Sequence, residues 1–130
     1  MRSISICPFA NFKSIFSWTR YFTEVHHHKL LEYTDGLRRP SALLYTIGNP
    51  LIAQMILKHN ILAALNIPPR LLIQEKSDEI GTTVSYYLPS SMMARPEGDN
   101  DPVLQVGLQD LDSKLKTLVE RITKPVNIKL

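Results

Sequence analysis

The chain has 130 residues, of which 44% are hydrophobic and 21% charged. These values are typical of a single globular domain and exclude a disordered or collagen-like chain, and the single cysteine, Cys7, excludes an internal disulfide framework and a cysteine-based metal cluster. The net charge of +3 is scattered and no run of about 18 apolar residues exists, so we expect neither nucleic-acid binding nor a membrane span.

The first 21 residues are predicted to form a segment of their own. Residues 3–7 alternate as a short strand that ends before Pro8, and apolar residues then follow at helical spacing, namely Phe9, Phe12, Ile15 and Phe16. The segment is free of acidic residues, as in a mitochondrial presequence, but it lacks the long apolar run of a secretory signal. We therefore expect a cytoplasmic protein, with a mitochondrial location as the alternative.

A helix, a turn and a buried strand are predicted next. Residues 24–33 have partial helical spacing of their apolar side chains, and Asp35-Gly36 marks a turn. Residues 42–47 form a short apolar run with β-branched and aromatic members, which is typical of a buried strand.

The sequence Gly48-Asn49-Pro50 predicts a sharp turn from this strand into a helix. Asn49 can cap the helix through its side-chain oxygen, and Pro50 suits the first helical position. The apolar stripe that follows ends near Lys58 and His59, and Asn60 is a plausible stop. Free N–H groups at such a helix start can hold an anion, although a plain capped turn explains the same residues.

The second half predicts a hairpin and a long helix. Residues 70–75 and 82–88 read as two antiparallel strands, and Tyr86 lies on the apolar face of the second. After a polar loop, Asp101 and Pro102 begin a helix that ends before Pro125. Its leucines recur every three or four residues for fewer than three heptads, which favours a helix packed on the sheet over a coiled coil.

The histidines are the first candidates for chemistry. Consecutive residues His26, His27 and His28 cannot all face one ion, because neighbouring side chains point in different directions on a helix or a strand. A metal site would need His27 together with Glu24 or His59, and core packing of one histidine is the alternative reading. We expect no cofactor, and no standard catalytic motif is present in the sequence.

An ordered string of motifs resembles a known family, the domain-of-unknown-function family numbered 302. It comprises residues 47–53, His59-Asn60, residues 64–68, residues 71–75, residues 85–91 and the leucine helix. The form of these motifs is similar to the fungal branch, and the resemblance covers residues 22–123. Residues 1–20 match the family poorly, residues 124–130 form a tail, and His59-Asn60 stands where His-Asp is usual.

The resemblance implies an α+β fold of the TATA-binding-protein-like class, in which an antiparallel sheet of four to five strands packs against helices in the order β-α-β(4)-α. It also implies a homodimer, but no reaction. We therefore expect a non-enzymatic module that binds a small, anionic ligand or forms a homodimer, with candidate ligand-binding residues Gly48, Asn49, Pro50, His27 and Tyr86. A metal- or histidine-dependent enzyme is the alternative.

Overall fold

The structure is a computed structural model that describes residues 2–6, 19–78, 80–98 and 101–124. Its elements follow one another along the chain as β1 (Arg2–Ile6), β2 (Arg20–His26), α1 (His27–Asp35), β3 (Ala42–Gly48), α2 (Pro50–His59), the 3₁₀ helix η2 (Ile61–Asn66), β4 (Arg70–Glu75), β5 (Thr82–Tyr86), α3 (Pro89–Met93) and α4 (Pro102–Thr123). The helix predicted at residues 9–16 and the tail at residues 125–130 lie outside the described residues.

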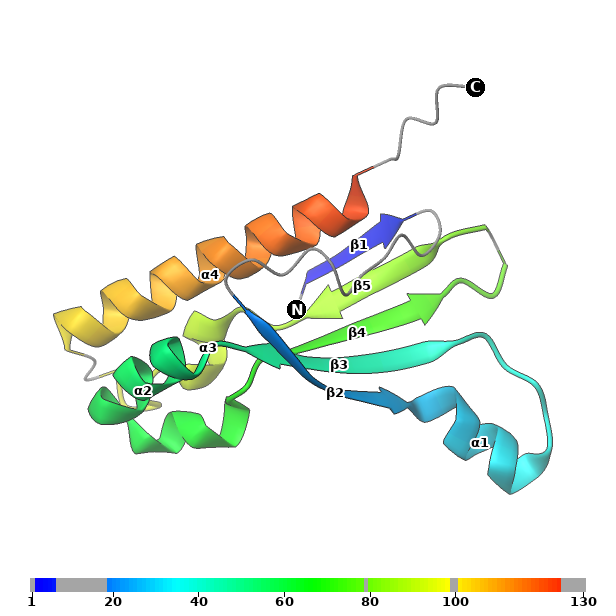
Figure 1. Cartoon of the computed structure of the whole chain (residues 1–130), viewed down its shortest axis with the longest axis horizontal. Helices are drawn as coiled ribbons and strands as arrows, with labels where there is room; N and C mark the ends of the chain where they lie inside the picture. Colours follow the sequence, from blue (N-terminus) through cyan, green and yellow to red (C-terminus); the bar gives the residue numbers. More distant parts are fainter. Residues whose placement is uncertain (1, 7–18, 79, 99–100, 125–130) are drawn as a thin grey trace.

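The five described strands form one antiparallel sheet in the order β1-β5-β4-β3-β2 (Figure 1). The predicted hairpin is confirmed, since Leu72 lies opposite Ser85 and Glu75 opposite Thr82. The α+β class with an antiparallel sheet is therefore confirmed. Strands β2 to β5 and the final helix follow the implied chain order, but α1, α2, η2 and α3 stand between them.

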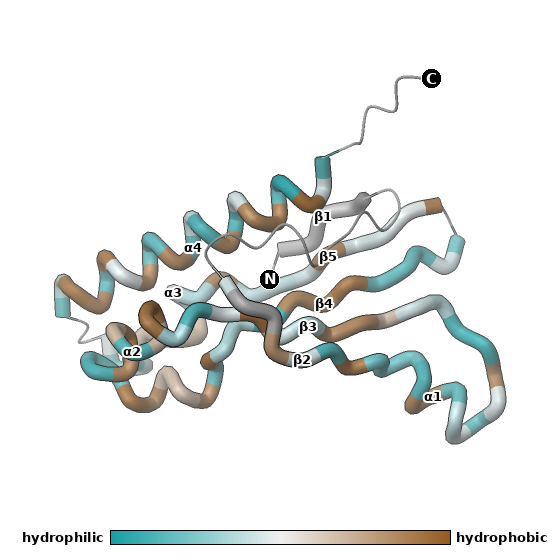
Figure 2. The backbone as a smooth tube through the Cα atoms, viewed as in Figure 1, coloured by the Kyte–Doolittle hydropathy of each residue, from teal (hydrophilic) through white to brown (hydrophobic). Residues whose placement is uncertain are grey.

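One face of the sheet carries the main core beneath α4. Alternate side chains of β3, β4 and β5 point to this face, as the two-residue period of a strand requires. They pack against the leucine stripe of α4, whose apolar and polar residues alternate in bands along the helix (Figure 2). The cluster consists of Leu43, Tyr45, Ile47, Leu71, Ile73, Val84, Tyr86, Leu115, Leu118 and Val119. The prediction of a core helix on the sheet is confirmed.

A second core cluster lies beyond the end of the sheet, where α2, η2 and α3 gather against the first half of α4 (Figure 1). Its buried members are Ile56, Ala63, Met93, Leu104, Leu108 and Leu111. Gly107 of α4 allows the close approach of α2, because a Cβ atom at this position would lie 2.2 Å from the Met55 Cε atom.

Three sequence predictions need correction. Residues 24–26 belong to β2 and not to a helix, because they pair with Leu43 to Tyr45 of β3, and this pairing overrides weak helical spacing. Strand β5 ends at Tyr86, two residues earlier than expected. Pro89 not only terminates a strand but also begins the short helix α3. In the first turn of α3, the Ser90 N–H donates a hydrogen bond to the Asp112 carboxylate at 2.8 Å.

An ion pair holds the loop between α1 and β3. The Arg39 guanidinium contacts both carboxylate oxygens of Asp35, with Nη1 2.8 Å from Oδ1. The hydrogen bond from Arg39 is the largest of the causes that lower the pKa of Asp35 to about 2 from 3.8. A carboxyl group with a lowered folded-state pKa stabilises the fold when ionised. Its contribution is therefore complete above pH 3.8 and is lost as the pH falls towards 2.

We expect the variant Arg39→Met to lower the melting temperature more at pH 6 than at pH 2, because pH 2 is close to the folded-state pKa of Asp35 and about half of its charge is lost there. The effect should be small, since the pair is solvent-exposed. Thermal unfolding of both proteins at the two pH values measures it, with Arg38→Met at the exposed neighbouring arginine as the control. An equal difference at both pH values would contradict the role of this ion pair.

Candidate functional site

The turn between β3 and α2 has the geometry that the sequence predicts. The Asn49 side chain caps α2, because its Oδ1 accepts the Leu51 N–H at 2.9 Å, and Pro50 occupies the first turn of the helix. The Asn49 carbonyl accepts the Ala53 N–H at 3.0 Å. Asn49 therefore satisfies the N–H groups of Leu51 and Ala53 at the helix start.

An apolar cavity of about 220 Å³ lies against this turn. Side chains from four elements and two connections line it, and it opens to the surface where the second core cluster meets edge strand β2. The lining residues are Phe22, Gly48, Asn49, Pro50, Ile52, Ala53, Ile56, Ile67, Pro68, Pro69, Met93 and Leu111.

Gly48 is buried, and its missing side chain leaves part of the room in the cavity. A Cβ atom at this position would lie 3.1 Å from the Pro68 Cβ and 3.4 Å from Cε2 of the Phe22 ring. The backbone of the turn can therefore approach both side chains closely. The sequence analysis explained Gly48 by the turn of the backbone, whereas the structure shows a steric reason for a glycine at this position.

The lining of the cavity is electrically neutral. None of its residues carries a charge, and Asn49 is the one residue among them with a polar side chain. Pro50 has no N–H group, and the Leu51 N–H is already bonded to Asn49. Moving a charged group into such surroundings without a partner costs several kcal/mol or more. The arrangement therefore suits an uncharged, apolar molecule better than an anion.

The other two predicted ligand-binding residues lie outside this cavity. Tyr86 is 2% exposed and belongs to the main core beneath α4. His27 is exposed at the start of α1, at the other end of β2 from the Gly48 turn. Of the five predicted residues, the structure brings together Gly48, Asn49 and Pro50.

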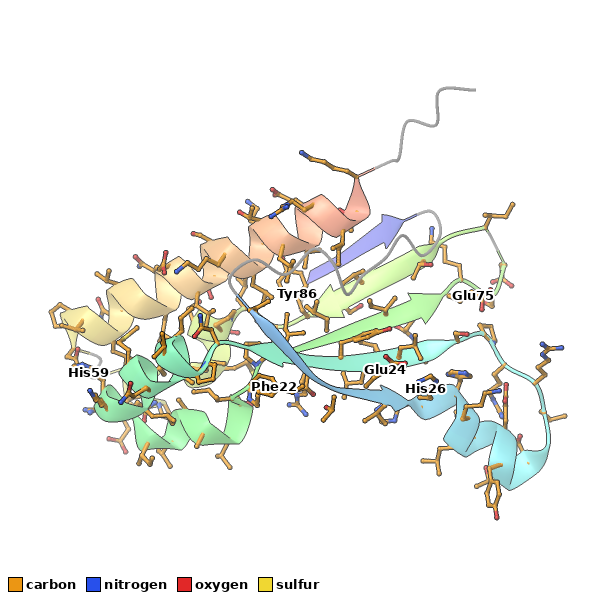
Figure 3. The ribbon with its side chains drawn as sticks, in the orientation of Figure 1. Phe22, Glu24, His26, His59, Glu75 and Tyr86 are labelled. Atoms are coloured by element: carbon orange, nitrogen blue, oxygen red, sulfur yellow. The ribbon has the colours of Figure 1, made fainter. Side chains whose placement is uncertain are left out.

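The candidate metal ligands are also apart. Glu24 bonds its neighbour His26, with 2.5 Å between Oε1 and Nε2, whereas His59 lies at the opposite end of the molecule (Figure 3). His28 is the buried histidine of the run, and its Nδ1 accepts the Ala42 N–H at 3.0 Å. Within the described ranges, no three histidine, cysteine or acidic residues are grouped as metal ligands would be.

His59 has a partner that the sequence analysis missed. Its Nδ1 lies 2.8 Å from Oδ2 of Asp101, and Oδ1 of the same carboxylate caps α4 by accepting the Leu104 N–H at 2.8 Å. The Leu104 hydrogen bond is the main cause that lowers the pKa of Asp101, and the His59 hydrogen bond adds to it. His59 lines an open surface depression that also includes Lys58, Arg95 and Glu97.

Most of the cavity wall could not be found from the sequence. Phe22, Met93 and Leu111 come from elements far apart in the chain, and each looks like an ordinary core residue. In the sequence, Pro68-Pro69 indicated the end of an apolar stretch but did not indicate a binding site. The Gly48-Asn49-Pro50 turn was the one local signal, since a strand followed by a capped helix start is recognisable in a single sequence.

In the part of the chain that the structure describes, no helix is both long and apolar enough to cross a membrane. No match is found among curated protein sequences. A solved structure, described as the crystal structure of the uncharacterized conserved protein DUF302 from Bacillus stearothermophilus, has a similar fold with a TM-score of 0.76. The similarity covers 93% of this chain and 96% of that chain at 16% sequence identity. The family model described as "Domain of unknown function DUF302" matches residues 19–122, and the chain therefore belongs to this family.

Proposed function

We propose that the protein is a non-enzymatic module that binds a small, uncharged, apolar molecule in the cavity beside the Gly48-Asn49-Pro50 turn. The observation that carries this proposal is the cavity itself, which combines about 220 Å³ of space with an almost entirely apolar wall. Ligand sites in proteins are mostly apolar with few polar groups, and Asn49 is the one residue of this lining with a polar side chain.

The size of the cavity limits the ligand. An engineered apolar cavity of about 150 Å³ in another protein binds benzene, which has six non-hydrogen atoms. By the same ratio, roughly nine such atoms fit into about 220 Å³. A ligand of roughly nine non-hydrogen atoms therefore fills the cavity, and no room remains inside it for a long chain.

We expect Ala53→Phe to abolish binding of cyclohexylmethanol, a neutral probe of suitable size. Ala53 lines the cavity from α2, and a phenyl group there would occupy the space of the ligand. The control is Ala64→Phe, which adds the same group at an exposed position of η2. The dissociation constant is measured by NMR titration of each protein, and a ligand at ten times this constant should stabilise the wild type by about 1.4 kcal/mol.

The anionic ligand expected from the sequence is tested in the same titrations with inorganic phosphate and cyclohexanecarboxylate. The neutral wall leads us to expect weaker binding of both than of the alcohol. Tight phosphate binding that survives Ala53→Phe would contradict the proposed cavity. Failure of every neutral probe to bind the wild type would also contradict it.

The alternative function, a metal- or histidine-dependent enzyme, keeps one supporting observation. The Asp101 carboxylate accepts a hydrogen bond from His59 Nδ1, and this arrangement orients the imidazole ring as in many catalytic sites. A polar compound that binds wild type and Ala53→Phe equally, but not His59→Gln, would favour this alternative.

The resemblance also supplies proposals about assembly and origin that stay predictions. These are the homodimer, the fungal-type branch, the TATA-binding-protein-like class and a domain bounded at residues 22 and 123. The cytoplasmic or mitochondrial location, expected from the first 21 residues, also stays a prediction. The ligand-binding proposal does not depend on any of them.

A further inference from the structure

Two side chains that line the apolar cavity interact more favourably with an aromatic ring than with an aliphatic one. Phe22 presents its ring to the cavity from edge strand β2, and it is 45% exposed, so part of the ring remains accessible. Met93 contributes a buried thioether from α3. Aromatic pairs gain energy beyond the burial of their area, and a sulfur atom beside a ring adds a further favourable contact.

The part of the wall beside the Phe22 ring suits a flat molecule. Three proline rings line the cavity, from the start of α2 and from the connection before β4, namely Pro50, Pro68 and Pro69. Gly48 adds a stretch of backbone with no side chain, close enough for its missing Cβ to lie 3.4 Å from the Phe22 ring. Proline and glycine have no branched side chain, whereas Ile52, Ile56, Ile67 and Leu111 line the rest of the cavity.

Asn49 is the one lining residue with a polar side chain, and its Oδ1 already accepts the Leu51 N–H, so the wall offers very little polar surface. A ligand with no more than one hydroxyl or N–H group on an otherwise apolar ring would match this composition, whereas a carboxylate would lose its hydration with no cation in the lining to replace it. Roughly nine non-hydrogen atoms correspond to one six-membered ring with a short substituent, or to a fused five- and six-membered ring.

We infer that the ligand is a neutral aromatic compound of one ring or two small fused rings, with one polar substituent. This inference rests on the proposed function, because it names the class of molecule that the same cavity accepts. Phe22 is then the residue that sets the preference for an aromatic ligand. Its position at an exposed edge strand makes it suitable for substitution, because the main core does not include it.

The test compares benzyl alcohol with cyclohexylmethanol, which have the same number of non-hydrogen atoms and the same polar group. We expect the wild type to bind benzyl alcohol roughly three- to tenfold more tightly. Phe22→Leu should bring this ratio close to one by weakening benzyl alcohol binding. Tyr33→Leu removes an aromatic ring that is 90% exposed on α1, and it should leave the ratio unchanged.

The outcomes separate this inference from the proposed function. If both alcohols bind equally to the wild type and Ala53→Phe removes both, the aromatic preference is wrong and the cavity site stands. If the wild type prefers benzyl alcohol and Phe22→Leu keeps the same ratio, the assignment of Phe22 is wrong. If neither alcohol binds, both the inference and the proposed function fail. Circular dichroism and thermal unfolding of each variant establish that it is folded.

Discussion

The variant Leu115→Ala is expected to lower the free energy of unfolding by about 3–5 kcal/mol, the range of fully buried leucines in a well-packed core. Leu115 is 0% exposed, and it lies in the cluster that joins α4 to β3, β4 and β5. Its truncation removes apolar contacts with the sheet and leaves a cavity that rigid neighbours fill only in part. Urea unfolding, followed by circular dichroism, measures the change.

A matched control uses the same substitution at Leu65 of η2, which is 81% exposed. This variant should change the free energy of unfolding by less than about 0.5 kcal/mol. If Leu115→Ala cost no more than Leu65→Ala, α4 would not pack on the sheet as described. Because Leu115 does not line the ligand cavity, the affinity for cyclohexylmethanol should change little in the folded variant.

The elements that the sequence predicted well are those with local signals. The leucine spacing of α4 and the Asp101 cap are contained within one helix, and the structure confirms both. The Asn49-Pro50 start of α2 is likewise confirmed. In each case the side chain and the backbone group that it satisfies are within a few residues of each other, so tertiary contacts are not needed to recognise the pattern.

The sequence was misleading, or left two interpretations open, where distant contacts decide the outcome. Residues 24–26 pair with β3, and nothing in their own spacing signals this partner. Tyr86 stands in a strand and could face either a core or a ligand, and its burial beneath α4 depends on residues about 30 positions later. The cavity has the same property, since Phe22 and Leu111 are brought to Gly48 by the sheet order and by the packing of α4.

The second large effect on the free energy of unfolding is expected at Asn60, whose polar side chain is buried among apolar neighbours. It is 6% exposed, its Nδ2 donates to the Met93 carbonyl at 2.8 Å, and its Oδ1 accepts the Leu62 N–H at 3.3 Å. These bonds connect the end of α2 and the start of η2 with the end of α3. Met93 also lines the apolar cavity beside the Gly48-Asn49-Pro50 turn, so Asn60 positions part of the cavity wall.

We expect Asn60→Ala to lower the free energy of unfolding by about 1–3 kcal/mol, since it leaves the Met93 carbonyl without its hydrogen bond inside the protein. Asn66→Ala is the matched control: Asn66 Nδ2 donates to the neighbouring Met92 carbonyl, also at 2.8 Å, but this bond is exposed and water can replace it. Urea unfolding of both variants measures the difference. Equal losses would show that burial of the Asn60 hydrogen bond is not the reason for its contribution to stability.

A folded Asn60→Ala protein should also bind cyclohexylmethanol more weakly, because Met93 is then held less firmly, whereas Asn66→Ala should retain the wild-type affinity.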